Sequence, residues 1–206
     1  MKPADRKIYL ASKSPRRREL LRQIGVDFEL LLLRDQRPSG PDVSEVVLAG
    51  EAAEDYVLRV TLEKAECAQK AMLLRRLPMR PILAADTTVV LDGQILGKPE
   101  SLQHAIDMLT SLSGRTHQVL TAIAVRADDE TWHALHRSEV TFTALTDDTI
   151  RTYCATPEPF DKAGGYGIQG LAALFIEDMV GSYSSIMGLP LFETAQLLQQ
   201  AGLRIL

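Results

Sequence analysis

The sequence predicts an α/β fold in which a mixed β-sheet is flanked by helices. Short runs of strand-forming residues alternate along the chain with segments whose apolar residues recur at helical spacing. Asp92-Gly93, a two-residue turn typical of antiparallel hairpins, separates two such runs, so the sheet is not expected to be purely parallel. With 206 residues the chain can form one sizeable core. We therefore expect a single domain over residues 1–206.

The N-terminal segment predicts a strand, a serine-rich turn and a helix. Residues 8–11 are apolar, Ser14 is a favoured N-cap, Pro15 suits the first helical position, and Gly25 ends the helix. A helix N-terminus followed by the arginines of residues 16–18 can bind an anion. The same residues also fit a capped helix with its arginines facing solvent. Both interpretations remain open at this point.

The next elements are a strand, a loop and a long helix. Residues 28–33 form an apolar run, and residues 34–50 change to Pro, Gly, Ser and Asp, which indicates an exposed loop. Residues 51–76 then carry a broad apolar face at helical spacing. Lys64 lies in the middle of this helix, where a lysine is usually solvated, so its position alone indicates no function.

Residues 81–99 are the central stretch of the sequence. The apolar runs 82–85 and 89–91 flank Asp86, and an isolated buried carboxylate is so costly that it must meet a partner, a metal or water. The turn after the second run brings Lys98 back toward the acid. A strand end with a solvated Asp86 and a surface lysine also fits this stretch when it is taken alone.

The C-terminal half continues the alternation of helices and strands. Ser101 can cap a helix that Gly114 ends, and a glycine-rich segment at residues 161–170 allows backbone to approach a ligand closely or to take positive φ. No metal-ligand motif surrounds His117. The remaining elements that we expect are strands at 116–125, 138–142 and 171–176 and helices at 146–153 and 190–201.

Composition excludes several classes of protein. The formal net charge of −4 gives no global basic field for nucleic acid or an anionic membrane. No apolar segment approaches the length of a membrane span, and the N-terminus lacks a secretory signal. Cys67 and Cys154 belong to no paired motif, which favours reduced, packed thiols and a cytoplasmic location. We expect neither a nucleic-acid partner nor a membrane partner.

Several separated segments, in this order along the chain, resemble the Maf family of nucleoside triphosphate pyrophosphatases. They are LASKSPRRRELL (10–21), LEKA (62–65), AADTTVVLDGQILGKP (84–99), SGRTHQVLTAIAV (113–125), DKAGGYGIQG (161–170) and GSYSSIMGLPLFET (181–194). The resemblance covers nearly the whole chain. It implies an inosine-triphosphatase-like α/β fold with a cleft between two lobes, often as a homodimer.

The resemblance also implies an activity: hydrolysis of a nucleoside triphosphate to the monophosphate and pyrophosphate, assisted by Mg²⁺ or Mn²⁺. Asp86 matches the catalytic acid/base position of the family and is a candidate metal ligand. Family members commonly carry a second acidic residue after the strand that corresponds to residues 28–33, and Asp35 is the candidate here. A positive cradle for the phosphates is expected from Ser12, Ser14, Arg17, Lys64 and Lys98.

Three positions separate the family branches by base preference. Arg16, Thr87 and Gln169 match the branch that acts on dTTP and UTP, whereas the 7-methyl-GTP branch typically has an aromatic residue first and Glu third. The amide of Gln169 offers one donor and one acceptor, which suits the imide N–H and carbonyl of uracil or thymine. A nucleotide-binding regulator of septum formation with little turnover is the main alternative. A pyrophosphatase that prefers purine or methylated bases is a third, which Gln169 and Arg16 disfavour.

Overall fold

The computed structural model describes residues 7–34 and 42–205, and it divides into two compact units. The first unit comprises the residues up to Asp86, then Ala122–Leu135 and the residues from Gly188 onward. The second comprises Thr87–Thr121 and His136–Met187. Three strands contain residues of both units, and each unit is described below by itself.

The elements follow one another in the order predicted for an alternating α/β chain. They are β1 (Ile8–Leu10), α1 (Pro15–Gln23), β2 (Phe28–Leu30), α2 (Ala53–Leu74), β3 (Ile82–Leu91), β4 (Gln94–Leu96), α3 (Leu102–Leu112), β5 (Thr116–Ala127), β6 (Glu130–Phe142), α4 (Asp147–Cys154), the 3₁₀ turns η1 (Glu158–Asp161), η2 (Ala163–Gly165) and η3 (Leu171–Phe175), β7 (Ile176–Val180), α5 (Tyr183–Ile186) and α6 (Leu191–Gln200).

The sheet is mixed, as predicted. Its hydrogen-bonding order is β2-β1-β3-β5-β6-β7, with β4 paired to β3 outside this path. Strand β1 runs parallel to both β2 and β3, whereas β4 and β7 are antiparallel to their neighbours. The turn between β3 and β4 is the predicted one: Asp92 and Gly93 both have positive φ, the conformation that a tight hairpin turn needs.

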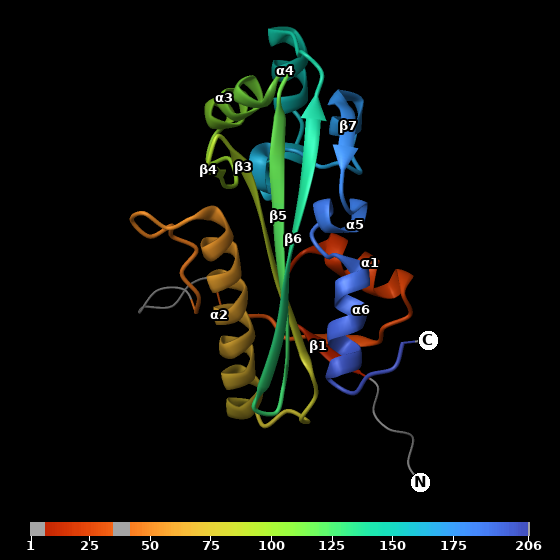
Figure 1. The fold of residues 1–206 in the computed structure, drawn as a ribbon. Coiled ribbons are helices and arrows are strands. Elements are labelled where there is room, and N and C mark those ends of the chain that lie inside the picture. The colour runs from red at the N-terminus through yellow and green to blue at the C-terminus, as the bar shows by residue number, and fades with distance from the viewer. Residues whose placement is uncertain (1–6, 35–41, 206) are drawn as a thin grey trace. The chain divides into compact units, whose positions relative to one another are not determined.

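In the first unit, helices cover both faces of the sheet. Helix α2 lies on one side of the strands, and α1 and α6 lie on the other (Figure 1). Helix α1 begins as predicted, because Ser14 accepts a hydrogen bond from the amide of Arg17. The core under α2 consists of small and apolar side chains from the helix and the strands, among them Tyr9, Ala65 and Ala124. Small residues allow the helix to approach the strands closely.

In the second unit, an aromatic cluster fills the core. The rings of His117, Phe142 and Tyr166 pack edge to face, with centroids 4.8 to 5.3 Å apart. His117 Nε2 lies 2.7 Å from the hydroxyl of Tyr166. His117 is only 2% exposed and is therefore a core histidine. Tyr166 belongs to the glycine-rich segment, so the hydrogen bond anchors that segment to β5.

Two predicted elements need correction. Residues 171–176 were expected to form a buried strand, but they form the 3₁₀ turn η3, followed by β7. Ala172 and Phe175 are buried while Leu171 and Leu174 are exposed, a spacing of three that matches a 3₁₀ turn rather than a strand. The two apolar runs around Asp86 belong to one continuous strand, so Asp86 does not lie at a strand end.

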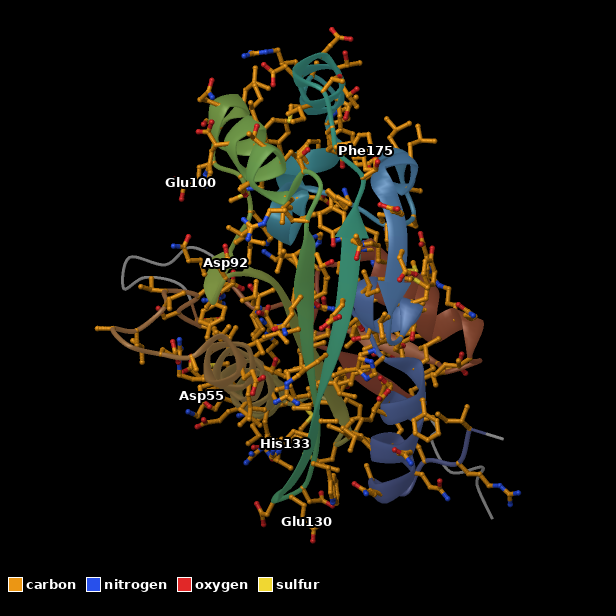
Figure 2. The ribbon with its side chains drawn as sticks, turned by 45° about the horizontal axis from the view of Figure 1, so that its top comes forward. Asp55, Asp92, Glu100, Glu130, His133 and Phe175 are labelled. Carbon is orange, nitrogen blue, oxygen red and sulfur yellow. The ribbon has the colours of Figure 1, made fainter. Side chains whose placement is uncertain are left out.

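Strand β6 is also longer than expected, since it begins at Glu130 rather than Ser138. Most side chains in its first half are partly or fully exposed, so this half needs no apolar run and the sequence pattern did not indicate a strand there. Figure 2 shows Glu130 and His133 at the end of the hairpin that joins β5 to β6.

Cys154 is buried, Cys67 is half-buried, and both are free thiols. Burial raises the pKa of both. In the described part of the chain, no helix has the length and apolar character needed to cross a membrane.

Candidate active site

Asp86 meets a cation within the first unit. It lies in the middle of β3, where the chain is buried on both sides of it, and its side chain is 14% exposed. Lys64 of α2, 15% exposed, places Nζ 2.7 Å from Asp86 Oδ1. The partner that the sequence required for this carboxylate is therefore Lys64, and the mid-helix lysine is not simply solvated.

Lys64 also binds a second carboxylate. Its Nζ lies 2.6 Å from Oε1 of Glu45, which belongs to the loop before α2. The hydroxyl of Tyr56 donates to the main-chain oxygen of Glu45 at 3.1 Å and so helps to hold that loop. Burial, together with the charges of Asp86 and Glu45, raises the pKa of Tyr56 to about 12. One ammonium group thus joins two carboxylates from separate segments.

Arg17 is fixed by three acceptors in the first unit. Its Nε donates to the carbonyl of Gly188 at 2.7 Å, and its Nη1 donates to Ser12 Oγ at 3.1 Å and to the carbonyl of Ala85 at 2.8 Å. Burial lowers the pKa of Arg17, while the nearby charge of Asp86 opposes that shift. An arginine stays protonated in proteins, so Arg17 supplies a fixed positive charge beside Asp86.

The serine turn organises the start of α1 around this arginine. Ser12 is 8% exposed, and its hydroxyl accepts from the amide of Ser14 at 3.2 Å. Ser14 in turn caps the helix. Arg16 lies close enough for its charge to lower the pKa of Arg17 further. The capped helix is therefore real, but Arg17 turns inward instead of facing solvent.

In the second unit, Thr87 belongs to a short chain of hydroxyl groups. Its Oγ1 lies 3.0 Å from Oγ1 of Thr121, which donates to the carbonyl of Ser185 at 2.8 Å. Because the single proton of Thr121 is used in that bond, the hydroxyl of Thr87 is the donor within the pair. The rotamer of Thr87 is thereby fixed by a buried neighbour.

The glycine-rich segment and the turn that carries Lys98 lie together in the second unit. The amide of Gly164 donates to the carbonyl of Gly97 at 3.0 Å. A Cβ on Gly164 would come within 2.8 Å of Val89, and φ there is +70°, so only glycine fits. Lys98 and Gln169 are both exposed. The close backbone approach that these glycines allow is therefore seen between Gly164 and Val89 of strand β3.

A family model described as "Maf-like protein" matches residues 7–201. The chain belongs to the Maf family. It is 57% identical over 203 residues to a "dTTP/UTP pyrophosphatase" of Aromatoleum aromaticum, with 98% of each chain covered. A protein of the same name from Ralstonia nicotianae is 55% identical over 199 residues, covering 96% of this chain and 95% of that one. The predicted family is confirmed.

A solved structure supports the fold as well. The Staphylococcus aureus Ham1 protein matches 95% of this chain and 99% of its own with a TM-score of 0.50 and 16% sequence identity. At that identity the likeness concerns the fold alone. Together with the mixed sheet and its flanking helices, it confirms the predicted α/β fold of the inosine-triphosphatase-like type.

The structure brings together most of the Maf site residues that were predicted, unit by unit. In the first unit, Ser12, Ser14 and Arg17 form one hydrogen-bonded group, with Arg16 near Arg17. Lys64 pairs with Asp86, and Arg17 donates to the carbonyl of Ala85, the residue before Asp86. Thr87, Lys98 and Gln169 belong to the second unit. Asp35 lies outside the described residues. The roles of all these residues stay predictions.

Sequence reasoning missed Glu45. The family pattern called for an acidic residue after β2, but the loop from 34 to 50 contains several acids and no spacing that singles one out. Only the fold, which places Glu45 against Lys64, identifies it as the acid that faces Asp86 across a shared cation.

The donor set fits a divalent cation that completes its coordination with substrate. In the described ranges, no three His, Cys, Asp or Glu side chains gather as a ready metal cage. Asp86 and Glu45 nevertheless converge on one positive charge, that of Lys64. Mg²⁺ is commonly held by one or two carboxylates plus substrate phosphates. Asp86 and Glu45 supply the two carboxylates that such a site needs.

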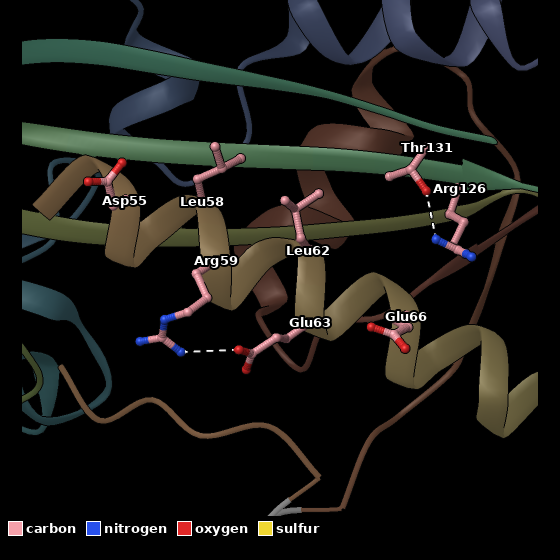
Figure 3. A pocket seen from close by; sticks show the side chains of 8 residues that line it. All are labelled: Asp55, Leu58, Arg59, Leu62, Glu63, Glu66, Arg126 and Thr131. Atoms are coloured by element: carbon pink, nitrogen blue, oxygen red, sulfur yellow. Dashed lines mark hydrogen bonds and ion pairs between the residues drawn. The ribbon is translucent and has the colours of Figure 1, made fainter. Parts of the chain in front are cut away.

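A pocket on α2 is lined by none of the predicted Maf site residues. It has a volume of about 510 Å³ and is shown in Figure 3; Asp55, Leu58, Arg59, Leu62, Glu63, Glu66, Arg126 and Thr131 line it. Its two cations are already engaged, Arg59 by Glu51 and Glu63 and Arg126 by Gln69 and Thr131. Three carboxylates on the rim make it a poor site for a triphosphate, so we do not place the chemistry there.

Proposed function

We infer that this Maf protein is a pyrophosphatase that hydrolyses dTTP and UTP to the nucleoside monophosphate and pyrophosphate. The observation that carries the inference is the Lys64–Asp86 pair beside Arg17, in a chain 57% identical along its length to a protein named for this reaction. A carboxylate next to fixed cations suits hydrolysis of a polyanion, which needs an oriented water and charge neutralisation.

Arg17, Ser12, Ser14, Lys64 and Lys98 are the phosphate-binding residues in this proposal. Arg17 is pre-positioned by three hydrogen bonds, so little side-chain entropy is lost when it binds an anion. The N-terminus of α1 adds main-chain N–H groups and the positive end of the helix dipole. Lys98, in the second unit, is exposed.

Asp86 is the general base. Lys64 occupies Oδ1, which leaves Oδ2 to orient a water and to accept its proton as the water oxygen attacks the α-phosphorus. The bond between the α-phosphorus and the bridging oxygen breaks, and pyrophosphate leaves. The cations compensate the negative charge that develops on the leaving group.

Asp86 and Glu45 are the residues that would hold a divalent metal, Mg²⁺ or Mn²⁺, together with phosphate oxygens of the substrate. When bound, the metal supplies charge neutralisation on the phosphates. Lys64 meanwhile keeps the two carboxylates from repelling each other. Asp35 remains a candidate ligand on the family pattern alone.

Arg16, Thr87 and Gln169 set base preference in the proposal. The side-chain amide of Gln169 pairs with the adjacent donor and acceptor of uracil or thymine. Thr87 is held by Thr121, which suits a fixed contact. A homodimer is a further expectation from the family resemblance. A single domain over residues 1–206 and a cytoplasmic location are expectations from the chain length and from the unpaired cysteines.

The test incubates the purified protein and Mg²⁺ or Mn²⁺ with a panel of nucleoside triphosphates and separates pyrophosphate from orthophosphate. We expect pyrophosphate, in amounts equal to the monophosphate, from dTTP and UTP. Orthophosphate as the first product would overturn cleavage between the α- and β-phosphates. Tight nucleotide binding without turnover would instead support the regulatory alternative.

A further inference from the structure

The glycine-rich segment exposes one functional side chain. Gly164 to Ile168 are buried, whereas Gln169 is exposed. The amide of Gly170 donates to the carbonyl of Gly167 at 2.9 Å, which closes a four-residue turn with Ile168 and Gln169 at its centre. The backbone of this turn determines where the Gln169 amide points.

Glu158 holds the C-terminal side of that turn. Its carboxylate accepts the amides of Leu171 at 2.8 Å and Ala172 at 3.3 Å and the hydroxyl of Tyr153 at 3.0 Å. A Cβ on Gly170 would lie 2.4 Å from either carboxylate oxygen, so the carboxylate is packed directly against this glycine. Glu158 therefore fixes the backbone immediately after Gln169.

Lys162 holds the N-terminal side. Its side chain is 13% exposed, and its stem crosses Gly167 so closely that a Cβ there would meet Cε at 2.8 Å. Its Nζ donates to the main-chain oxygen of Glu158 at 2.7 Å and also pairs with Asp161. The two sides of the turn are thus tied together through Glu158 and Lys162.

An amide side chain needs such support if it is to select one pyrimidine over another. Rotating the amide of Gln169 by 180° exchanges its donor and its acceptor. The two rotamers match uracil and cytosine respectively, because the cytosine ring presents an acceptor and an amino donor where uracil presents a donor and a carbonyl. Gln169 can discriminate between UTP and CTP only if its backbone is held in one place, where one rotamer is favoured.

We propose that Glu158 and Lys162 are positioning residues that hold the turn around Gln169 and thereby set the selectivity for uracil and thymine over cytosine. The proposal rests on the proposed pyrophosphatase function. Neither residue needs to touch the substrate. Their effect is exerted through the backbone of residues 167–172.

The test measures kcat/KM for UTP and CTP in the parent, Glu158→Gln and Lys162→Met, with inhibition by inorganic tripolyphosphate as a probe that has a tail but no base. Glu158→Gln removes one accepting oxygen, and Lys162→Met keeps the stem over Gly167 but removes the ammonium. We expect the UTP:CTP ratio to fall at least about tenfold in each variant, while the inhibition constant of tripolyphosphate changes less than about twofold. Glu177→Gln, on exposed β7, is the matched control and should leave both values unchanged.

Each outcome is decisive. Lys162→Arg, which restores the charge, should recover part of the selectivity, as a role confined to overall stability would not. Folded variants with an unchanged UTP:CTP ratio, or a parallel loss of tripolyphosphate binding, would overturn the positioning role. A parent that hydrolyses UTP and CTP equally would also overturn it while leaving the pyrophosphatase intact. A parent that releases no pyrophosphate from UTP would overturn the proposed function itself.

Discussion

At the scale of single residues, the number of hydrogen-bond donors on a side chain explains which groups it contacts in the site. Lys64 has three N–H donors, and it uses them on Asp86 and Glu45, two acids that would otherwise repel each other. Arg17 presents its planar fork to two carbonyls and a hydroxyl. Gln169, by contrast, is exposed. In the proposed function, the cations that bind the phosphate tail are held by hydrogen bonds, whereas the residue that recognises the base is exposed.

Gln169→Glu should reduce kcat/KM for dTTP and UTP by at least about tenfold, because a carboxylate has no donor for the base carbonyl. It should penalise 7-methyl-GTP much less, since that cationic base offers donors to a carboxylate. The measurement is the ratio of kcat/KM for dTTP to that for 7-methyl-GTP in the parent and the variant. An unchanged ratio would mean that another residue recognises the base.

The local environment of a residue could be predicted where its chemistry allows few alternatives. Asp86 between two apolar runs required a partner, and the Ser14–Pro15 cap predicted where α1 starts. Glu45 could not be predicted, because its pairing with Lys64 depends on how the loop folds and not on any local pattern. The sequence could not show that the side chain of Arg17 points inward, since its hydrogen-bond acceptors come from distant segments such as Gly188.

At the scale of elements, Arg59 of helix α2 holds the loop that carries Glu45. Arg59 of α2 binds both oxygens of Glu51, at 2.6 and 2.9 Å, and also reaches the carbonyl of Val46 at 3.0 Å. This arrangement lowers the pKa of Glu51 to about 2 and raises that of Arg59. The arginine thus fastens the loop that carries Glu45. In Figure 3 its guanidinium also meets Glu63 of the same helix.

Arg59→Ala should release that loop. We expect faster hydrogen exchange at Leu48, whose amide donates to Glu51, and a drop of about tenfold in kcat/KM because Glu45 no longer stays on Lys64. Amide hydrogen exchange, followed by mass spectrometry or NMR, measures the opening of the loop. Steady-state assays measure kcat/KM. Lys70→Ala, which removes an exposed pair with Glu66 on the same helix, is the control and should leave both unchanged.

Element boundaries show the limits of periodicity. Helices α2 and α3 were predicted to within about two residues because their apolar residues recur at helical spacing, and because Ser101 caps α3 as predicted. The segment 171–176 is apolar enough for a strand, yet Glu158 accepts two of its amides and favours a 3₁₀ turn there. That carboxylate lies 13 residues earlier in the sequence, so no local pattern could reveal its effect.

At the scale of the whole molecule, stability depends on a buried histidine. Burial lowers the pKa of His117 to about 4, from an ordinary value of 6.5. The folded protein therefore binds this proton less readily than the unfolded chain. The contribution of His117 is fully present above pH 6.5 and is lost as the pH falls from 6.5 toward 4.

The free energy of unfolding should consequently fall by up to about 3 kcal/mol across that range, at about 1.4 kcal/mol per pH unit. Urea unfolding at pH 7.5, 6, 5 and 4 measures it. His117→Gln should lower stability at neutral pH but flatten this part of the profile. His133→Gln, at an exposed position on β6, should leave the profile as it is in the parent. A parent profile with no slope between pH 6.5 and 4.5 would contradict the account.

The central claim is that Asp86 activates the water that cleaves a pyrimidine nucleoside triphosphate, and the most direct measurement is pyrophosphate release from dTTP by Asp86→Asn. We predict a loss of at least ~10² in kcat, the usual scale for removal of a general base, with dTTP binding retained by calorimetry. Asp92→Asn, the same change at the end of the same strand, where asparagine tolerates the positive φ, is the control and should keep full activity. Near-normal turnover by Asp86→Asn would contradict the account.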